Sequence, residues 1–143
     1  MRLLRRLFRR PASSGTLRVS YAPRANGRPD PGEVVWGWVP FEEDPQQGKD
    51  RPVLLIGRDG RQLLGLMLTS KDHDRDVEQE TRRGRHWMDV GTGAWDRQRR
   101  PSEVRLDRLI RLAPSAVRRE GAALDRATFD RVIAAARSFH PLA

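Results

Sequence analysis

The chain has 143 residues, with 28 Lys and Arg against 19 Asp and Glu, which gives a formal net charge of +9. A chain of this length forms one domain around a single core. It contains no cysteine, which excludes disulfide frameworks, thiolate metal sites and a cysteine nucleophile and fits the cytoplasmic location that we predict. The sequence has no apolar run close to the roughly 20 residues of a membrane span.

Most of the positive excess lies near the N-terminus. Residues 1–30 carry eight arginines against Asp30, a net +7, whereas residues 31–143 carry 20 basic and 18 acidic residues, a net +2. We therefore predict a basic, flexible extension over residues 1–30 and one nearly neutral domain over residues 31–143. Leucine, phenylalanine and arginine alternate in residues 1–10, typical of a membrane-surface or nucleic-acid arm but equally of a frayed leader. Residues 16–21 fit a short extended segment.

Three consecutive segments then have the pattern of a β-meander. Residues 34–39 are β-branched and aromatic, and residues 53–56 form an apolar run short enough for a buried strand. Asp59 and Gly60 are the signal of a tight hairpin turn, and residues 62–68 make the return strand.

Two polar stretches connect these and later elements. Residues 40–50 form a loop that is long for a hairpin connection, and loops of this kind are often functional or mobile. Residues 72–80 alternate acids around His73, but the sixth and twelfth positions of a calcium loop are wrong, so a solvated acidic loop is the better interpretation.

The second half of the chain predicts two strands and a helix. Residues 86–90 fit a short strand, and the alternation in residues 104–112 changes phase, which indicates a bulge or a strand running into a turn. Asp125 is a good N-cap for a C-terminal helix. Apolar residues at helical spacing form one face of that helix and comprise Phe129, Val132, Ile133, Ala136 and Phe139. We expect His140, after the helix, to be exposed.

The hairpin predicts a cluster at its open end. Arg51 begins the second strand, and Thr69 and Ser70 end the third, so these side chains should lie together, away from the turn at Gly60. A guanidinium opposite a hydroxyl can stabilise the negative charge that develops on a phosphoryl group. Such a cluster can bind a phosphoryl group and stabilise charge on it without a metal.

Aromatic and lysine side chains near this end are candidate RNA contacts. Aromatic rings stack on unpaired bases, and lysine attracts phosphate. The alternative for the tryptophans is packing in the core of a small barrel. The candidates are Trp38, Phe41, Lys49, Lys71 and Trp95.

The ordered set of these motifs resembles the MazF/PemK toxin family over residues 31–139. The resemblance rests on the Gly-Glu-Val-Val-Trp opening at residues 32–36, on residues 48–56 with their Arg-Pro pair, and on Thr69 and Ser70. The proline that often stands two residues before the threonine is Met67 here.

Membership of this family implies a mainly β fold, an SH3-like barrel with a C-terminal helix. It implies a homodimeric endoribonuclease that cuts single-stranded RNA to a cyclic phosphate without a cofactor, held inactive by a cognate antitoxin. It also makes Arg51 and Thr69 the catalytic pair, with Ser70 assisting.

Some alternatives stay open. Arginine stays protonated and so does not readily act as the base that deprotonates the 2′-OH. The sequence does not choose between Glu33 and Glu42 for that role. A non-catalytic SH3-like barrel that binds RNA or a protein partner is the alternative function. A gyrase-poisoning toxin is a third, less favoured because that family shares the barrel but not the Arg-Pro and Thr-Ser pairs.

Overall fold

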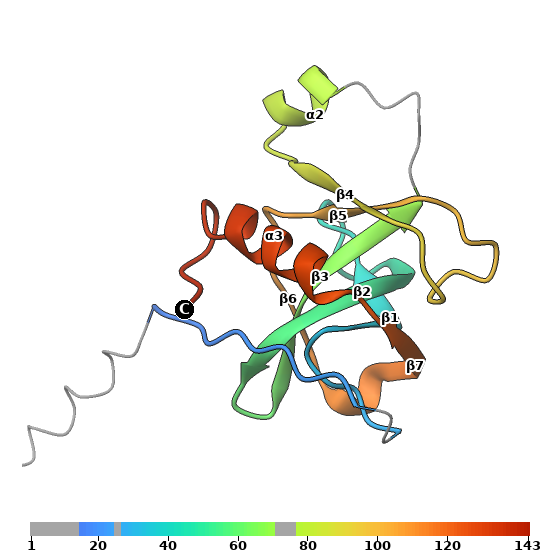
Figure 1. Ribbon diagram of the computed structural model, residues 1–143. Coiled ribbons are helices and arrows are strands. Elements are labelled where there is room, and N and C mark those ends of the chain that lie inside the picture. Colours follow the sequence, from blue (N-terminus) through green and yellow to red (C-terminus); the bar gives the residue numbers. More distant parts are fainter. Residues whose placement is uncertain (1–14, 25–26, 71–76) are drawn as a thin grey trace, which may run out of the picture.

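The computed structural model describes residues 15–24, 27–70 and 77–143, without the side chains of residues 119 and 120. The described residues form a seven-stranded antiparallel sheet in the order β4-β5-β3-β2-β1-β7, with β6 paired to β3, and a C-terminal helix lies across the sheet (Figure 1). The predicted mainly β fold with a C-terminal helix is confirmed. The strands are β1 Glu33–Pro40, β2 Gly48–Asp59, β3 Gln62–Ser70, β4 Trp87–Gly91, β5 Ser102–Arg105, β6 Ile110–Leu112 and β7 Val117–Ala123, and the helices are α2 Val77–Arg82, the 3-10 turn η1 Pro114–Ala116 and α3 Arg126–Ala136.

The meander at the centre of the sheet has longer strands than the sequence predicts. The ladder between β1 and β2 continues to Val39↔Lys49 and Pro40↔Gly48, so the connection shrinks to residues 41–47. The expected loop over residues 40–50 was therefore too long. Gly48 permits this extension, because a Cβ there would collide with the carbonyl group of Val39. Pairing, rather than apolar character, decides where this strand begins.

The tight turn between β2 and β3 is confirmed. The ladder ends at Asp59↔Gln62, and Gly60 has a φ of +64°, a backbone conformation that glycine adopts without strain. The hairpin therefore has its closed end at Gly60 and its open end at the start of β2 and the end of β3.

Strand β3 belongs to two parts of the curled sheet. Its beginning pairs with β2 on one side and with β6 on the other, through Gly65↔Ile110. Its end pairs with β5 through Leu68↔Val104 and Ser70↔Ser102. The phase change predicted in residues 104–112 is the turn between β5 and β6, where the chain leaves one side of β3 and pairs again further along it.

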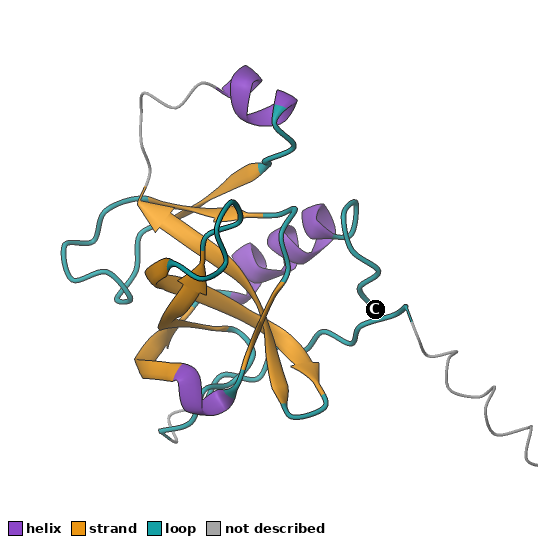
Figure 2. Ribbon diagram, turned by 180° about the vertical axis from the view of Figure 1, so that it is seen from behind, coloured by secondary structure: helices purple, strands orange, loops and turns teal. Residues whose placement is uncertain are grey.

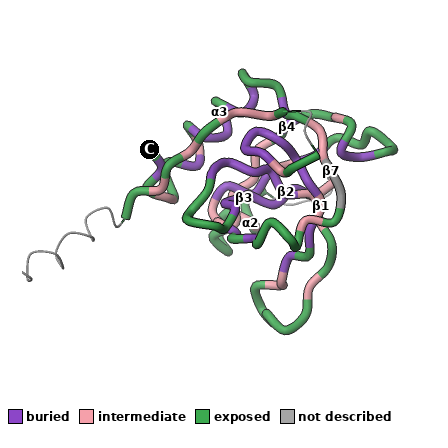
Figure 3. Tube along the Cα trace, turned by 90° about the horizontal axis from the view of Figure 1, so that it is seen from below, coloured by how far each residue is buried: buried purple, intermediate pink, exposed green. Residues whose placement is uncertain are grey.

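Two hydrophobic clusters lie on the two faces of the meander. The larger cluster contains Val34, Leu54 and Leu66 and packs under α3, whereas the smaller cluster contains Val35, Val53 and other residues. Figure 3 shows buried residues along the strands and exposed residues in the loops. The smaller cluster comprises Val35, Val39, Val53, Leu55, Leu63, Met67, Ile110 and Leu112.

Helix α3 begins as predicted but ends earlier than the apolar pattern indicates. The Asp125 carboxylate accepts a hydrogen bond from the Thr128 N–H at 3.0 Å, and Phe129, Val132, Ile133 and Ala136 are buried. Phe139 lies beyond the helix and is 38% exposed, so its assignment to the buried face was wrong.

The expected exposure of His140 was also wrong. Its ring is partly buried, with Nε2 2.9 Å from the Leu106 carbonyl oxygen. The turn after α3 folds back over the end of β5 and brings the imidazole to this carbonyl.

The described part of the N-terminal region packs against the domain. Leu17 pairs with Leu142 and Val19 with Gly57, as expected for a short extended segment over residues 16–21. Figure 2 shows the C-terminus beside this loop segment. The Tyr21 hydroxyl donates to the Leu124 carbonyl at 2.7 Å. Residues 15–24 therefore contribute to the core, and the amphipathic pattern in residues 1–10 lies outside the described residues.

Two elements were not predicted. Helix α2 occupies the end of the expected acidic loop, whose residues 71–76, including His73, lie outside the described part of the chain. Strand β7 has too many charged residues to show strand alternation, but it pairs with the free edge of β1. Among the described residues, no helix is long and apolar enough to cross a membrane.

Candidate functional site

The open end of the β2–β3 hairpin holds the predicted pair Arg51 and Thr69. The ladder between these strands starts at Val53↔Met67, and beyond that pair the two strands are not paired with each other, although each stays paired on its other edge. Arg51 pairs with Gly37 in β1, and Thr69 pairs with Glu103 in β5. The strands therefore separate at this end and leave the two side chains at the rim of the sheet.

Strand alternation places these two side chains on one face. Arg51 lies two residues from Val53, and Thr69 lies two residues from Met67, which is the ladder partner of Val53. Both side chains therefore project on the face of the smaller cluster, and both residues are partly buried. Ser70 follows Thr69 directly, so alternation turns its side chain to the opposite face, the side of the larger cluster.

A second arginine reaches the same rim from the turn between β5 and β6. Arg108 donates from Nη2 to the Pro40 carbonyl at 2.7 Å, and its Nη1 lies 3.9 Å from the Met67 sulfur. These contacts hold its guanidinium between the end of β1 and the end of β3, beside the start of β2. The positive charge of Arg108 contributes to lowering the pKa of Arg51.

Arg51 and Arg108 are partly buried, unlike the exposed arginines of the described chain that also lack an ion pair. Seven other arginines form ion pairs with carboxylates: Arg58, Arg85, Arg100, Arg105, Arg111, Arg118 and Arg126. Within the described ranges, neither Arg51 nor Arg108 has an ion pair. Burial and the nearby positive charge of Arg108 together lower the pKa of Arg51 below its ordinary value. The rim therefore carries positive charge that the described residues do not neutralise.

A compensated cluster lies directly beside this pair. Arg105 is buried, with a side chain 6% exposed, and forms hydrogen bonds with both Glu42 and Asp107. Asp107 also accepts the His86 backbone N–H at 2.7 Å. Burial opposes the charged form of Asp107, but the hydrogen bonds from Arg105 and His86 outweigh it and lower the pKa of this carboxyl group.

This cluster also anchors the connection between β1 and β2. Glu42 stands in that loop and reaches Arg105 at 2.8 Å, while Arg108 holds the Pro40 carbonyl. The hydrogen bond from Arg105, with the charges of Arg105 and Arg108, lowers the pKa of Glu42. The loop over residues 41–47 is therefore fixed at the rim by its first residues.

The structure separates the two acids between which the sequence did not choose. Glu33 is buried at the start of β1, and its Oε1 accepts the Asp30 N–H at 3.0 Å. Gly37, the partner of Arg51, lies four residues further along β1, roughly 13 Å away at the usual rise of a strand. Glu42 instead has a side chain 47% exposed and lies within the field of Arg108.

The predicted RNA contacts are divided among several positions. Lys49 is exposed and has the same strand parity as Arg51, so it lies on the face of that residue. Trp38 is 39% exposed but has the opposite parity, and Phe41 lies in the loop. Lys71 is outside the described residues.

Trp95 belongs to the larger cluster. It is only 4% exposed, its Nε1 donates to the Ser102 hydroxyl at 3.1 Å, and its carbonyl accepts from Trp36. A ring in this position does not present a face to a nucleobase. The core alternative that the sequence left open therefore describes Trp95.

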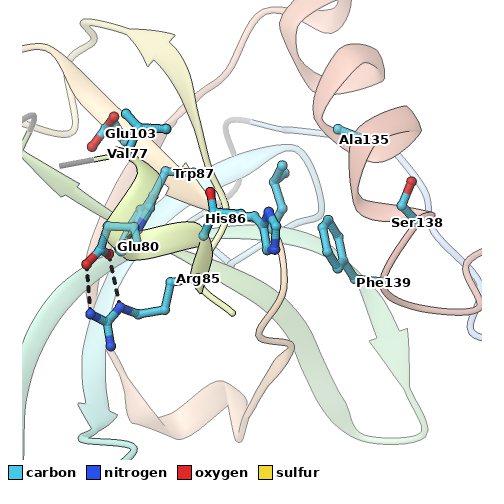
Figure 4. Close-up of a pocket in the computed structure, with 11 residues that line it drawn as sticks. Val77, Glu80, Arg85, His86, Trp87, Glu103, Ala135, Ser138 and Phe139 are labelled. Carbon is cyan, nitrogen blue, oxygen red and sulfur yellow. Dashed lines mark hydrogen bonds and ion pairs between the residues drawn. The ribbon is translucent and has the colours of Figure 1, made fainter. Parts of the chain in front are cut away.

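A pocket of about 340 Å³ lies elsewhere, between α2, β4 and the turn after α3 (Figure 4). Phe139 faces His86 across it, with ring centroids 4.7 Å apart, and Glu80 binds Arg85 at 2.7 Å. Its lining residues are Val77, Glu80, Thr81, Arg85, His86, Trp87, Glu103, Leu106, Ala135, Ser138 and Phe139. The candidate pair Arg51 and Thr69 is not part of this lining.

The described residues contain no group of three or more His, Cys, Asp or Glu side chains arranged to hold a metal ion.

Comparison with protein-family models gives a match to the PemK-like, MazF-like toxin of type II toxin–antitoxin systems over residues 30–140. The chain belongs to this family. The match spans the sheet and α3, and the resemblance inferred from the motifs is confirmed. A comparison with curated proteins returned no match.

The sequence interpretation of this toxin-family chain missed three residues at the rim, Arg105, Asp107 and Arg108. The signal was present, because two arginines and an aspartate stand within four residues of the phase change. Charged residues in a strand that loses its alternation indicate a turn at a polar site. Only the pairing of β5 with the end of β3 shows that this turn lies beside Arg51.

Proposed function

We propose that this chain is a toxin-type endoribonuclease that cuts single-stranded RNA without a metal, with Arg51 and Thr69 as the groups that act on the phosphate. The observation that carries the proposal is the partly buried Arg51 guanidinium, which lies beside a second arginine and has no carboxylate partner among the described residues. Desolvated like charges favour binding of an anion.

The reaction is an in-line transfer within the RNA. The ribose 2′-oxygen forms a bond to phosphorus, the bond from phosphorus to the 5′-oxygen of the next nucleotide breaks, and a 2′,3′-cyclic phosphate remains. The proton of the 2′-OH passes to a base, and the leaving 5′-oxygen takes up a proton. Arg51 stabilises the charge on the phosphoryl oxygens, and the Thr69 hydroxyl donates to the same group. The Ser70 side chain starts on the other face, so in this proposal Ser70 assists indirectly, through its neighbour Thr69.

Glu42 is the better candidate for the base. It is exposed at the rim, whereas Glu33 is buried near the far end of β1. The hydrogen bond with Arg105 lowers the pKa of Glu42, so it is ionised at neutral pH, and its choice over Glu33 rests on its position and exposure because the same shift makes it a weaker base. Lys49 and Phe41 flank the same opening and are candidate contacts for the RNA strand.

Family membership supports the remaining parts of the proposal. A toxin of a type II system has an antitoxin, and we propose that this partner inhibits the chain by occupying the rim around Arg51. We further propose that the chain acts in the cytoplasm as a homodimer with the RNA groove at the subunit interface.

The test is cleavage of an end-labelled single-stranded RNA by the purified full chain in the presence of EDTA. We expect cleavage with a cyclic phosphate on the upstream product. Arg51→Ala should lower the rate by about 10² to 10³, the usual cost of one lost oxyanion donor.

Arg111→Ala is the matched control, because Arg111 pairs with Asp59 at the closed end of the hairpin, far from the rim. It should cleave like the wild type, and both variants should melt like the wild type. Equal cleavage by wild type and Arg51→Ala would remove Arg51 from the mechanism. An intact wild-type chain that binds RNA but leaves it uncut would establish the non-catalytic barrel instead.

A further inference from the structure

The turn between β5 and β6 carries an arginine that has a position in the site but no place in the mechanism above. Arg108 is partly buried and its hydrogen-bond partners are both uncharged, the Pro40 carbonyl and the Met67 sulfur. A guanidinium has several N–H donors in a planar fork, so these two contacts orient it and leave other donors available.

The two neutral contacts also locate this guanidinium. Met67 is the ladder partner of Val53, which lies two residues, roughly 7 Å, along β2 from Arg51. Pro40 is the ladder partner of Gly48, three residues on the other side of Arg51. Arg108 therefore spans the start of β2 from one neighbouring strand to the other, over the face on which Arg51 and Thr69 project.

Met67 gives this arrangement a character of its own in this chain. The flexible thioether of Met67 offers the Arg108 guanidinium a sulfur acceptor. The proline often found at this position in the resembled family has no such group. The neighbouring arginine in the chain, Arg105, is neutralised by Glu42 and Asp107. No carboxylate of the described residues pairs with Arg108 in the same way.

We propose that Arg108 binds the same RNA phosphate as Arg51, so that two guanidinium groups hold one phosphodiester before and during the reaction. Arg108 is thus a substrate-positioning residue, and this inference rests on the proposed function of the rim. A phosphodiester offers two non-bridging oxygens that point in different directions, one for each guanidinium. A carboxylate of an acidic peptide has both oxygens in one plane and satisfies one fork well.

Binding is measured with a single-stranded oligonucleotide that has 2′-deoxyribose at every position where cleavage would occur, titrated at several salt concentrations. Arg108→Gln should weaken binding about tenfold, as expected for a lost hydrogen bond to a charged group. The slope of log K against log salt should fall by about 0.7, which corresponds to one phosphate contact on a single strand. Arg111→Gln, three residues along the chain, is the control and should change neither quantity.

Steady-state cleavage gives a second readout that a purely structural role would not move in the same way. Arg108→Gln should raise KM about tenfold and change kcat much less, whereas Arg51→Ala should act mainly on kcat. Arg108→Lys keeps a charge without the fork and should lie between the wild type and Arg108→Gln. Arg108→Lys also replaces Arg108→Gln as the test variant if the glutamine variant has a lower melting temperature because the contact with Pro40 is lost.

The outcomes separate this inference from the proposed function. If Arg108→Gln has the wild-type salt slope and KM, the inference is wrong even though cleavage stands. If the wild type binds the oligonucleotide through Arg108 but does not cut the corresponding RNA, the proposed function is wrong and the phosphate site stands. If Arg108 is needed for an acidic peptide and not for the oligonucleotide, the site takes carboxylates and the inference is overturned.

Discussion

The arginines Arg105 and Arg51 lie at the same rim of one sheet, yet their surroundings are opposite. Arg105 is buried and hydrogen-bonded to Glu42 and Asp107, and burial, which disfavours its charge, is outweighed by these bonds, so its pKa is raised. Arg51 is partly buried beside Arg108, and its pKa is lowered. One neighbourhood satisfies its charges within the protein, whereas the other leaves positive charge at the surface.

The difference separates charges that link elements of the fold from a charge that makes no such link, as the proposed phosphate site requires. The pairs of Arg105 join β5, the turn after it and the connection between β1 and β2, so they hold the rim together. Arg51 contributes no such link among the described residues. A charge retained at some cost in desolvation and without an internal partner is typical of a functional site.

The largest effect that would test this contrast is on stability. Arg105→Met should lower the free energy of unfolding by about 3 kcal/mol, because it leaves the Asp107 carboxylate poorly solvated and without its cation. We place the effect at the lower end of the range for broken buried pairs because Glu42 can turn to solvent. Urea unfolding monitored by tryptophan fluorescence measures it.

The matched variant is Arg51→Met, which should change the free energy of unfolding by no more than about 0.5 kcal/mol or should stabilise the domain slightly. A loss as large as that of Arg105→Met would show that Arg51 also supports the fold. In that case the contrast between the two neighbourhoods would disappear.

The pH dependence of stability sharpens the same comparison. Glu42 and Asp107 both have pKa values lowered in the folded protein, so each binds its proton more readily after unfolding. Their contribution is complete above the ordinary values, 4.5 for Glu42 and 3.8 for Asp107, and is lost as the pH falls toward the folded values. Stability should therefore decline below about pH 5.

This decline is measured as the free energy of unfolding between neutral and acid pH. In Arg105→Met the decline should be shallower, because the cation that lowers both pKa values is missing. Arg51→Met should keep the wild-type slope. An identical slope in wild type and Arg105→Met would mean that other carboxylates control the acid limb.

A loss of stability smaller than that of Arg105→Met is expected away from the rim and calibrates the others. Asp125→Ala removes the N-cap of α3, in which the carboxylate accepts from the Thr128 N–H, and should cost about 1 kcal/mol. Asp125→Asn keeps an acceptor and should recover most of this loss. Equal stability of Asp125→Ala and wild type would show that packing of the apolar face alone holds the helix.

Local signals in the sequence predicted much of the fold. The turn at Gly60, the apolar run in β2 and the N-cap at Asp125 each depend on residues close together in the chain, and each is present in the structure. Strand ends were less accurate, because β2 begins at Gly48 through pairing with β1 and not through its own apolar character. Phe139 was misplaced for a similar reason, since helical spacing continues past the residue where the helix ends.

The sequence by itself determined the family, the hairpin and the end of it at which Arg51 and Thr69 stand. Those conclusions follow from short-range motifs and from strand alternation. Only the tertiary structure decided which charges meet there, because Arg105 at the end of β5 and Arg108 in the turn after it come more than 50 residues after Arg51. Ion pairing depends on distances between elements that a linear pattern does not contain, so the neutralised Arg105 and the partly buried Arg108 without an ion pair among the described residues look alike in the sequence.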